Sequence, residues 1–376
     1  MRLSLNVRRA LTVRPSLVSL ASLRLRSGLF RSGGYHSLAW LALSAWLLAS
    51  PASAAPRIAS LDWTLAETLI ALDAPPVALA QVDDYESWVG LEAPPGATDI
   101  GLRTQPNLEL LSELDPDAIV ISPMFANLAP RLSSIAEVKQ LAMYSGEGTF
   151  WSQSLALTRQ LGELVDRENA AEALIEETEA YIADIAARLP EDTRPLLLLQ
   201  FMDERHVRLF GEHSLYQAVI ERMGLTNAWQ GTTNAWGFSL IGIEQLVNYP
   251  EARIVVVEPY IAGVREALAN SGLWRHLGSV QRDDVVTLPP VWSFGALPSA
   301  RRFATLLGDA LSSTTSDTSA SNTHTPDTSA PGTSTSDTHA PDTHALDTSV
   351  SDTSALGTSE QATTPDQVQG NTDARR

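Results

Sequence analysis

Apolar and polar positions alternate in a regular way between residues 57 and 311. Short apolar runs, typical of buried strands, are followed by segments in which apolar residues recur every three or four positions, as on one face of a helix. The first half contains predicted strands at residues 57–61, 77–80 and 118–121 and predicted helices at residues 65–72 and 107–114. Strands that alternate with helices favour parallel pairing through crossover helices.

A long helical segment follows at residues 151–189, and its pattern predicts two pieces with a break near residues 166–169. The second piece has one apolar face and ends at Pro190. A helix of about 20 residues is roughly 30 Å long, which is enough to cross a domain.

The second half of the core repeats the alternation. It contains predicted strands at residues 196–202 and 254–257, predicted helices at residues 214–223, 243–247 and 299–311, and a loop at residues 289–294. Two halves of this kind, joined by one long helix, predict an α/β fold with two α/β lobes and a ligand cleft between them.

The first 54 residues differ from this core. They contain seven arginines, no acidic residue, an apolar run of eleven residues at 38–48 and a small-x-small triplet at 52–54. This order is that of a cleavable secretory signal, and eleven apolar residues are too few to cross a bilayer as a helix. An uncleaved anchor or a buried helix is the alternative, and the arginine pair at residues 8 and 9 is a weak match to a twin-arginine export signal.

The last 65 residues, 312–376, contain no aromatic residue, and from Ser316 to Glu360 they repeat every five residues in units such as SDTSA and PDTHA. They cannot bury enough apolar surface to offset the entropy of ordering, so we expect a disordered spacer. The predicted organisation is a signal peptide at 1–54, an N-terminal lobe at 55–168, an interlobe helix at 169–190, a C-terminal lobe at 191–311 and a disordered tail at 312–376.

Composition excludes several classes of function. The chain of 376 residues carries a formal charge of −18, which argues against a nucleic-acid partner because phosphate binding needs basic patches. Residues 55–311 hold 35 acidic and 17 basic side chains, so the acidity belongs to the predicted lobes. Without cysteine the chain has no disulfide, no thiolate chemistry and no lipid-anchored N-terminal cysteine, so we expect a soluble exported protein and not a lipoprotein.

Motifs of catalysis are missing from the sequence. It contains no G-x-S-x-G elbow, no H-E-x-x-H motif and no Gly-rich phosphate loop. His206, His213 and His276 lack paired metal-ligand spacing, and the acidic pairs at residues 83–84 and 283–284 fit solvated turns better than acid–base chemistry. We therefore expect no enzymatic activity, no catalytic residue, no metal site and no cofactor.

Tryptophan and arginine give the strongest indication of a binding site. Seven tryptophans follow the leader, and several lie where a predicted strand gives way to a loop or a helix: Trp63, Trp88, Trp151, Trp229, Trp236, Trp274 and Trp292. Ligand crevices of α/β sheets lie at the carboxyl ends of the strands, so these positions favour an aromatic cleft, with core packing as the alternative. Arg103 precedes a predicted helix, where its guanidinium suits either an anionic ligand oxygen or a surface ion pair.

Two motifs are long and specific, GLRTQPNLELL at residues 101–111 and NAWQGTTNAWG at residues 227–237, and they occur with related segments at residues 57–80 and 291–303. In this order and spacing they resemble the periplasmic ferric-hydroxamate siderophore-binding proteins, the class III substrate-binding subunits of ABC importers. The resemblance covers residues 57–311 and neither end of the chain. It implies two α/β lobes, a rigid backbone helix with little hinge motion, and an aromatic cleft.

The resemblance also implies a set of site residues. Arg103 matches the arginine that contacts the hydroxamate oxygens around Fe(III), and the siderophore supplies all the iron ligands. Aromatic cleft positions of the family fall at Trp63, Trp88, Trp236 and Trp292. Phe125 and Phe294 stand where the family has tyrosine, which leaves Arg103 as the main polar anchor. Each lost neutral hydrogen bond would cost about 0.5–1.5 kcal/mol.

The partner implied by the resemblance is an ABC permease with its ATPase, which meets an acidic residue on each lobe. Glu244 fits the C-terminal position, whereas the N-terminal position holds Pro130, with Glu137 as a substitute. We expect a monomeric periplasmic receptor that delivers a ferric hydroxamate siderophore to this permease. The alternatives are a receptor for a haem, a corrinoid or a catecholate siderophore, the last disfavoured by a single cleft arginine, and a siderophore esterase.

Overall fold

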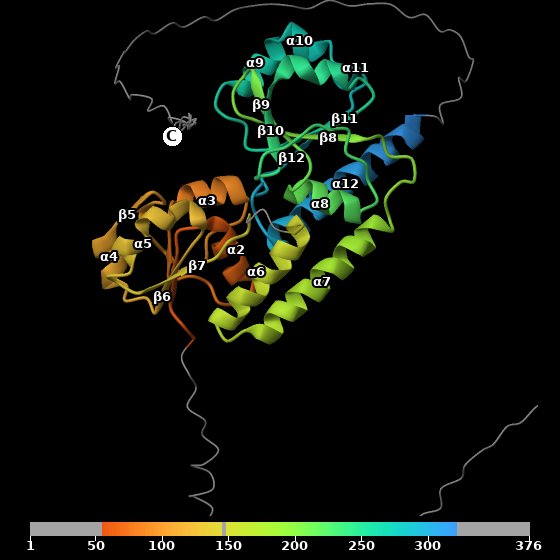
Figure 1. Ribbon diagram of the computed structural model, residues 1–376. Helices are drawn as coiled ribbons and strands as arrows, with labels where there is room; N and C mark the ends of the chain where they lie inside the picture. Colours follow the sequence, from red (N-terminus) through yellow and green to blue (C-terminus); the bar gives the residue numbers. More distant parts are fainter. Residues whose placement is uncertain (1–54, 145–147, 322–376) are drawn as a thin grey trace, which may run out of the picture. The chain divides into compact units, whose positions relative to one another are not determined.

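Two five-stranded sheets form the framework of the protein, one in each half of the chain (Figure 1). The structure is a computed structural model that describes residues 55–144 and 148–321. The predicted signal peptide and most of the predicted tail lie outside these residues. The predicted α/β fold is confirmed by the two sheets and the helices around them.

The N-terminal sheet is parallel throughout, in the order β3-β2-β1-β6-β7. Its strands are β1 (Ile58–Ser60), β2 (Ala78–Leu79), β3 (Thr98–Asp99), β6 (Ala118–Ile121) and β7 (Glu137–Gln140). The helical elements of this lobe are α2 (Trp63–Ala71), α3 (Val82–Val89), α4 (Leu108–Glu113), η1 (Pro123–Leu128) and α5 (Ala129–Leu132). Strands β1 and β6 are buried along their whole length, as expected for parallel strands that are covered on both faces. Side-chain oxygens of Asp62 and Asn107 cap α2 and α4.

The C-terminal sheet has the order β10-β9-β8-β11-β12, and only its last three strands are parallel. Its strands are β8 (Leu196–Phe201), β9 (His206–Phe210), β10 (Phe238–Gly242), β11 (Arg253–Val257) and β12 (Val285–Leu288). Its helical elements are α8 (Leu215–Arg222), η2 (Ile243–Asn248), α9 (Val264–Asn270), α10 (Gly272–Arg275) and α11 (Gly278–Gln281). The predicted parallel alternation is wrong for β9, which runs antiparallel to β8 and β10. Residues 202–205 join β8 to β9 by a turn that is too short for a parallel crossover.

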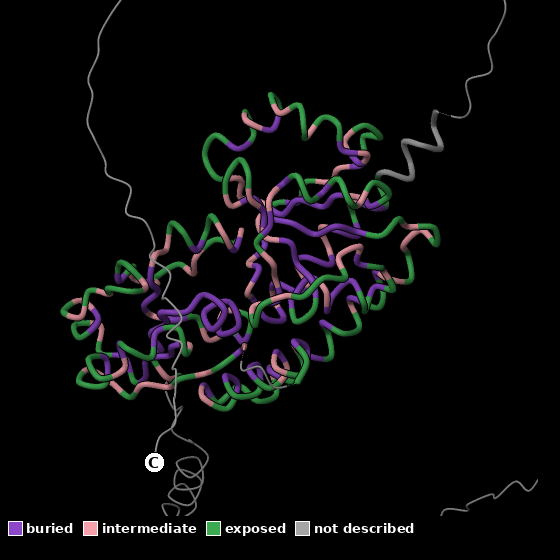
Figure 2. The backbone as a smooth tube through the Cα atoms, turned by 45° about the horizontal axis from the view of Figure 1, so that its top comes forward, coloured by how far each residue is buried: buried purple, intermediate pink, exposed green. Residues whose placement is uncertain are grey.

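The two lobes share one hydrophobic core. Helix α6 (Phe150–Leu164) and helix α7 (Glu168–Ala186) follow the N-terminal sheet, and α7 packs against both α6 and the closing helix α12 (Leu297–Ser321). A single cluster of buried side chains includes Ile58 of β1 and Leu198 of β8 and continues through these helices. Figure 2 shows the buried backbone passing from one lobe into the other. The lobes are therefore connected by packing as well as by the chain.

The predicted break in the long helix is confirmed. Helix α6 ends at Leu164 and α7 begins at Glu168. Between them, Asp166 has a φ angle of 55°, a left-handed conformation that stops a helix.

Three local predictions are wrong. Asp83 and Asp84 are exposed, as predicted, but they lie in the first turn of α3 and not in a turn between elements, since negative charge is favourable at a helix N-terminus. Asp284 is buried and not solvated, because it forms an ion pair with Arg253. Helix α12 continues to Ser321, beyond the predicted end at residue 311, because neither proline nor glycine interrupts residues 312–321. Across residues 55–144 and 148–321, no helix combines the length and apolar character needed to cross a membrane.

Candidate functional site

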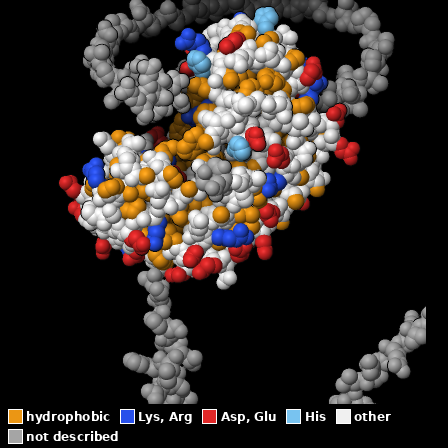
Figure 3. Space-filling model, in the orientation of Figure 1, with side chains coloured by type: hydrophobic (Ala, Val, Ile, Leu, Met, Phe, Trp, Pro, Cys, Tyr) orange, Lys and Arg blue, Asp and Glu red, His pale blue; other side chains and the backbone are white. Residues whose placement is uncertain are grey.

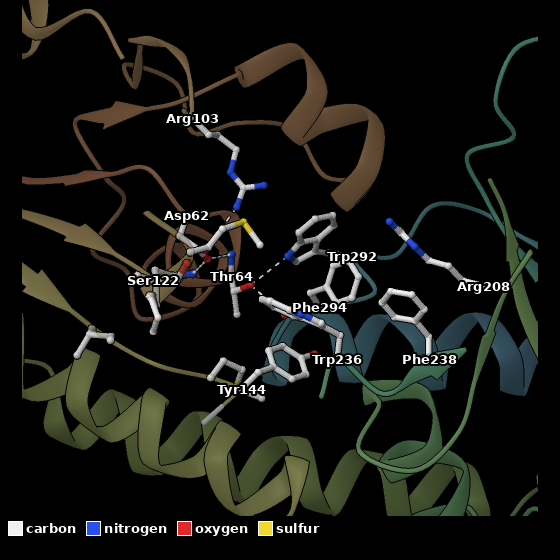
Figure 4. A pocket seen from close by; sticks show the side chains of 15 residues that line it. Asp62, Thr64, Arg103, Ser122, Tyr144, Arg208, Trp236, Phe238, Trp292 and Phe294 are labelled. Carbon is white, nitrogen blue, oxygen red and sulfur yellow. Dashed lines mark hydrogen bonds and ion pairs between the residues drawn. The ribbon is translucent and has the colours of Figure 1, made fainter. Parts of the chain in front are cut away.

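A cavity of about 330 Å³ lies between the two lobes, beside the carboxyl ends of β1 and β6. Hydrophobic side chains gather in the hollow between the lobes (Figure 3). Both lobes contribute to the lining, which consists of Asp62, Thr64, Leu65, Arg103, Ser122, Pro123, Met124, Leu141, Met143, Tyr144, Arg208, Trp236, Phe238, Trp292 and Phe294 (Figure 4). A crevice at the carboxyl ends of strands is the usual ligand site of an α/β fold.

Arg103 is fixed in place by hydrogen bonds to the start of α2. It lies in the turn of a hairpin formed by β4 (Gly101–Leu102) and β5 (Gln105–Pro106). Its Nε donates to the Leu61 carbonyl oxygen at 3.1 Å, and its Nη2 lies 3.3 Å from Asp62 Oδ2. Since the other carboxylate oxygen of Asp62 caps α2, the guanidinium is tied to the same helix terminus. The cation is therefore positioned before any ligand arrives.

Aromatic rings surround the Arg103 guanidinium. Its Cζ lies 4.3 Å from the ring centre of Trp63, 4.8 Å from that of Phe125 and 5.8 Å from that of Trp292. Burial lowers the pKa of Arg103, and the neighbouring Asp62 opposes this shift. Within the described residues its Nη1 has no hydrogen-bond acceptor, so this group can donate to a ligand.

Two aromatic residues of the opposite wall are held by a hydroxyl of the N-terminal lobe, one through its side chain and one through its backbone. Trp292 and Phe294 lie in the loop between β12 and α12. Trp292 Nε1 donates to Thr64 Oγ1 at 3.0 Å, and this hydroxyl donates in turn to the Phe294 carbonyl oxygen at 2.9 Å. The two rings meet edge to face, with their centres 5.2 Å apart.

Trp236 and Phe238 complete the aromatic wall from a compact turn. Asn234 Oδ1 accepts hydrogen bonds from the backbone N–H groups of both residues. Gly237 between them has a φ angle of 78°, and a Cβ at this position would lie 2.3 Å from the backbone nitrogen of Ser214. Glycine is required here, because any side chain would displace the turn and the two rings that it carries.

Arg208 is a second cation in the cavity, so the prediction of a single cleft arginine is wrong. It is the central residue of β9, and its Cζ lies 5.1 Å from the ring centre of Phe238 and 5.4 Å from that of Phe294. Its neighbours Val207 and Leu209 are buried, which places Arg208 on the other face of the strand. This alternation is the signal in the sequence that would have identified it.

Tyr144 is a further lining residue that the sequence patterns did not indicate. Its ring centre lies 5.1 Å from that of Trp236 and 6.2 Å from that of Phe294. Its hydroxyl is buried and has no hydrogen-bond partner within the part of the chain that the structure describes. Burial raises the pKa of Tyr144 well above its usual value, so the hydroxyl keeps its proton.

The lining as a whole is suited to binding. It offers the faces and edges of aromatic rings together with guanidinium donors, which can hold a bulky ligand that carries anionic oxygens. Residues 55–144 and 148–321 contain no group of three or more histidine, aspartate or glutamate side chains that could hold a metal ion.

Comparison with known proteins gives the family. Residues 58–291 match the sequence profile of the periplasmic binding proteins. The chain belongs to the periplasmic binding protein family.

The relatives of this periplasmic binding protein include iron-chelate receptors. The iron(3+)-hydroxamate-binding protein FhuD of Escherichia coli K12 is 33% identical over 261 residues, which cover 68% of this chain and 86% of FhuD. The Fe(3+) dicitrate-binding periplasmic protein FecB of the same organism is 26% identical over 236 residues, or 62% of this chain and 76% of FecB. A crystal structure of the siderophore-binding protein FhuD from Vibrio cholerae with bound Fe3+–Desferal matches with a TM-score of 0.65 at 28% identity, covering 68% of this chain and 97% of that chain. The resemblance found in the sequence is confirmed.

Four of the seven predicted site residues line the cavity of this binding protein: Arg103, Trp236, Trp292 and Phe294. Trp63 and Phe125 lie behind Arg103 and contact its guanidinium without lining the cavity, and both are almost fully buried. Trp88 packs in the small core cluster formed around α2 and α3. These three aromatic residues contribute to the support of Arg103 or of the lobe, and the cavity surface is formed by other side chains.

The predicted docking residues lie on the surface of the binding protein. Glu244 is exposed in η2, next to the exposed side chain of Val247. On the N-terminal lobe, Pro130 and Glu137 are also exposed, and Glu137 forms an ion pair with Lys139, the only lysine in the chain.

Proposed function

We propose that this periplasmic binding protein binds a ferric hydroxamate siderophore in the cavity between its lobes and delivers it to an ABC permease and its ATPase. The observation that carries the proposal is Arg103, held with its Nη1 group available, in a cavity walled by aromatic rings. The protein is also 33% identical in sequence to an iron(3+)-hydroxamate-binding protein, which supports the choice of ligand.

The chemistry of a ferric trihydroxamate fits this cavity. The complex is bulky, has an apolar outer shell, and exposes negatively polarised hydroxamate oxygens close to the metal. Aromatic rings such as Trp236 and Trp292 contact the shell, and Arg103 donates charge-assisted hydrogen bonds to the oxygens. The chelator supplies every iron ligand, so on this proposal the protein needs no cofactor.

The proposal also includes the export of the protein, its oligomeric state and its contacts with the permease. The protein is exported by a cleavable signal peptide, acts as a monomer in the periplasm and catalyses no reaction. Glu244 contacts the permease, and the matching acidic contact of the N-terminal lobe comes from Glu137.

Tryptophan fluorescence tests the ligand assignment. Trp236 and Trp292 line the cavity, so a bound ferric complex is expected to quench the fluorescence of both tryptophans. The purified protein would be titrated with ferrichrome, with the iron-free chelator and with a ferric tricatecholate. Quenching by ferrichrome and not by its iron-free form is expected, and no response to any ferric hydroxamate would refute the assignment.

A hydrolysis assay tests the absence of catalysis. Incubation of the protein with an ester-linked siderophore, followed by mass spectrometry, is expected to return the intact compound. Turnover at a rate proportional to protein concentration would favour an esterase instead.

A further inference from the structure

Arg208 differs from Arg103 in having no anionic partner. Within residues 55–144 and 148–321, the Arg208 guanidinium makes neither an ion pair nor a hydrogen bond, and it lies close to the rings of Phe238 and Phe294. Arg103, by contrast, is paired with Asp62. Arg208 is half-buried at the cavity wall. A guanidinium has five N–H donors, and when it is removed from water these are usually paired with acceptors, which Arg208 lacks within the described residues.

The cavity as a whole therefore has an excess of positive charge. Its charged lining residues are Asp62, Arg103 and Arg208, of which the first two neutralise each other. The remaining charge stands out in a chain whose formal charge is −18. Burial also lowers the pKa of Arg208, which reflects the cost of keeping this charge in a partly desolvated place.

The position of Arg208 separates it from the site where Arg103 acts. Arg103 projects from the N-terminal lobe and Arg208 from the C-terminal lobe, with Trp292 and Phe294 between them (Figure 4). A ligand whose iron centre lies against Arg103 thus presents a different part of its surface to Arg208. The guanidinium lies within cation–π distance of the rings of Phe238 and Phe294, and this attraction helps to keep it at the cavity wall.

We infer that Arg208 is a specificity-determining residue, which binds a carboxylate carried by the ferric hydroxamate ligand. The inference rests on the proposed function and narrows it. In a simple trihydroxamate complex the three hydroxamate charges cancel that of Fe(III), and such a complex gives Arg208 no anion to bind. A trihydroxamate chelate that carries an additional carboxylate, one that does not ligate the iron, has a net negative charge and satisfies both arginines.

Three ferric hydroxamates of different charge test this inference on the wild-type protein. Ferrichrome is neutral, Fe(III)–desferrioxamine B carries an ammonium group, and ferrichrome A is a trihydroxamate of the ferrichrome type whose acyl groups carry three carboxylates that do not ligate the iron. Fluorescence titration at neutral pH is expected to give the tightest binding for ferrichrome A and the weakest for desferrioxamine B. Binding of all three with similar affinity would overturn the inference and leave the proposed function intact.

The variant Arg208→Gln then identifies the residue responsible. We expect its affinity for ferrichrome A to fall about 10- to 100-fold, the range for a lost charge-assisted hydrogen bond, with ferrichrome affected less than threefold. Arg205→Gln is the matched control, because it removes one positive charge from an exposed position beside the same strand and should change neither affinity.

The possible outcomes distinguish failure of the role inferred for Arg208 from failure of the proposed function. An equal loss of affinity for ferrichrome and ferrichrome A in Arg208→Gln would mean that the residue shapes the cavity and does not bind a carboxylate. A ferric tricatecholate bound more tightly than ferrichrome A would assign the positive charge to a different ligand class. Failure of every ferric hydroxamate to bind would refute the proposed function itself. Thermal unfolding of each variant checks that it is folded.

Discussion

The pair formed by Arg103 and Asp62 gives the clearest prediction at the scale of single residues. Both side chains are almost enclosed, with 13% and 9% of their surface exposed. Arg103→Gln removes the cation that donates to the hydroxamate oxygens, so ferrichrome affinity should fall about 10- to 100-fold in a fluorescence titration. Arg131→Gln, an exposed arginine of the same lobe, serves as control. Unchanged affinity in Arg103→Gln would exclude Arg103 from ligand binding.

Glu67 is a buried carboxyl group where the two lobes meet. Its Oε1 accepts from the Ala296 backbone N–H at 2.7 Å, and its Oε2 lies 2.5 Å from Ser299 Oγ at the start of α12. Burial raises the pKa of Glu67 from 4.5 to about 7, against the lowering effect of these hydrogen bonds. The folded protein thus binds this proton more tightly than the unfolded chain, and stability decreases as pH rises from 4.5 to about 7.

Glu67→Gln tests this linkage. Glutamine can accept from Ala296 and donate to Ser299 without carrying charge, so we expect it to increase the free energy of unfolding by about 1–3 kcal/mol above pH 7. Urea denaturation at pH 5 and pH 8 should show a smaller pH dependence in the variant. Glu113→Gln, an exposed helical position, should behave as wild type. A variant that is less stable at pH 8 and keeps the wild-type pH dependence would contradict this account.

Single residues also show what sequence patterns could not predict. Motif matching placed Arg103, Trp236, Trp292 and Phe294 at the site, but it carries no information on side-chain direction. For that reason Phe125 was expected in the cavity, whereas its ring lies behind Arg103. Arg208 and Tyr144 belong to no motif, and only the packing of β9 and of the segment after β7 brings them to the cavity.

At the scale of elements, the contact between α6 and α7 depends on a small residue. A Cβ on Gly162 would lie 2.7 Å from the Cβ of Ala171. Gly162→Ala should therefore push the two helices apart and lower the free energy of unfolding by about 1–3 kcal/mol, measured by urea denaturation. Gly272→Ala in α10 meets no atom within 4 Å and should be close to neutral. Equal stability of both variants would show that the two helices can adjust without cost.

The elements that sequence patterns identified share strong local signals. Helices α2 and α4 begin at capping residues, β6 is a continuous apolar run, and the break before α7 occurs where predicted. The edge strand β7 was missed because its sequence, Glu137–Gln140, is mostly polar. The antiparallel pairing of β9 with β10 was missed because the two strands are separated by residues 211–237, which include α8, so their pairing depends on contacts between residues far apart in the chain.

At the scale of the whole molecule, the shared core predicts that the lobes move little on binding. The hydrophobic cluster that joins both sheets would have to be disrupted for the cleft to open or close widely. We expect the radius of gyration from small-angle X-ray scattering to change by less than about 1 Å when ferrichrome binds, in line with pre-organised complexes. A contraction of several ångströms would instead reveal a hinge between the lobes.

The same shared core has a consequence for how fast iron is captured. If no rearrangement of the lobes follows encounter, association is a single bimolecular step. In stopped-flow mixing, the observed rate should rise linearly with siderophore concentration and reach no plateau. At low siderophore concentration, iron capture would then be limited by how often the chelate meets the cavity, and each receptor molecule would be ready for the next encounter as soon as it was emptied.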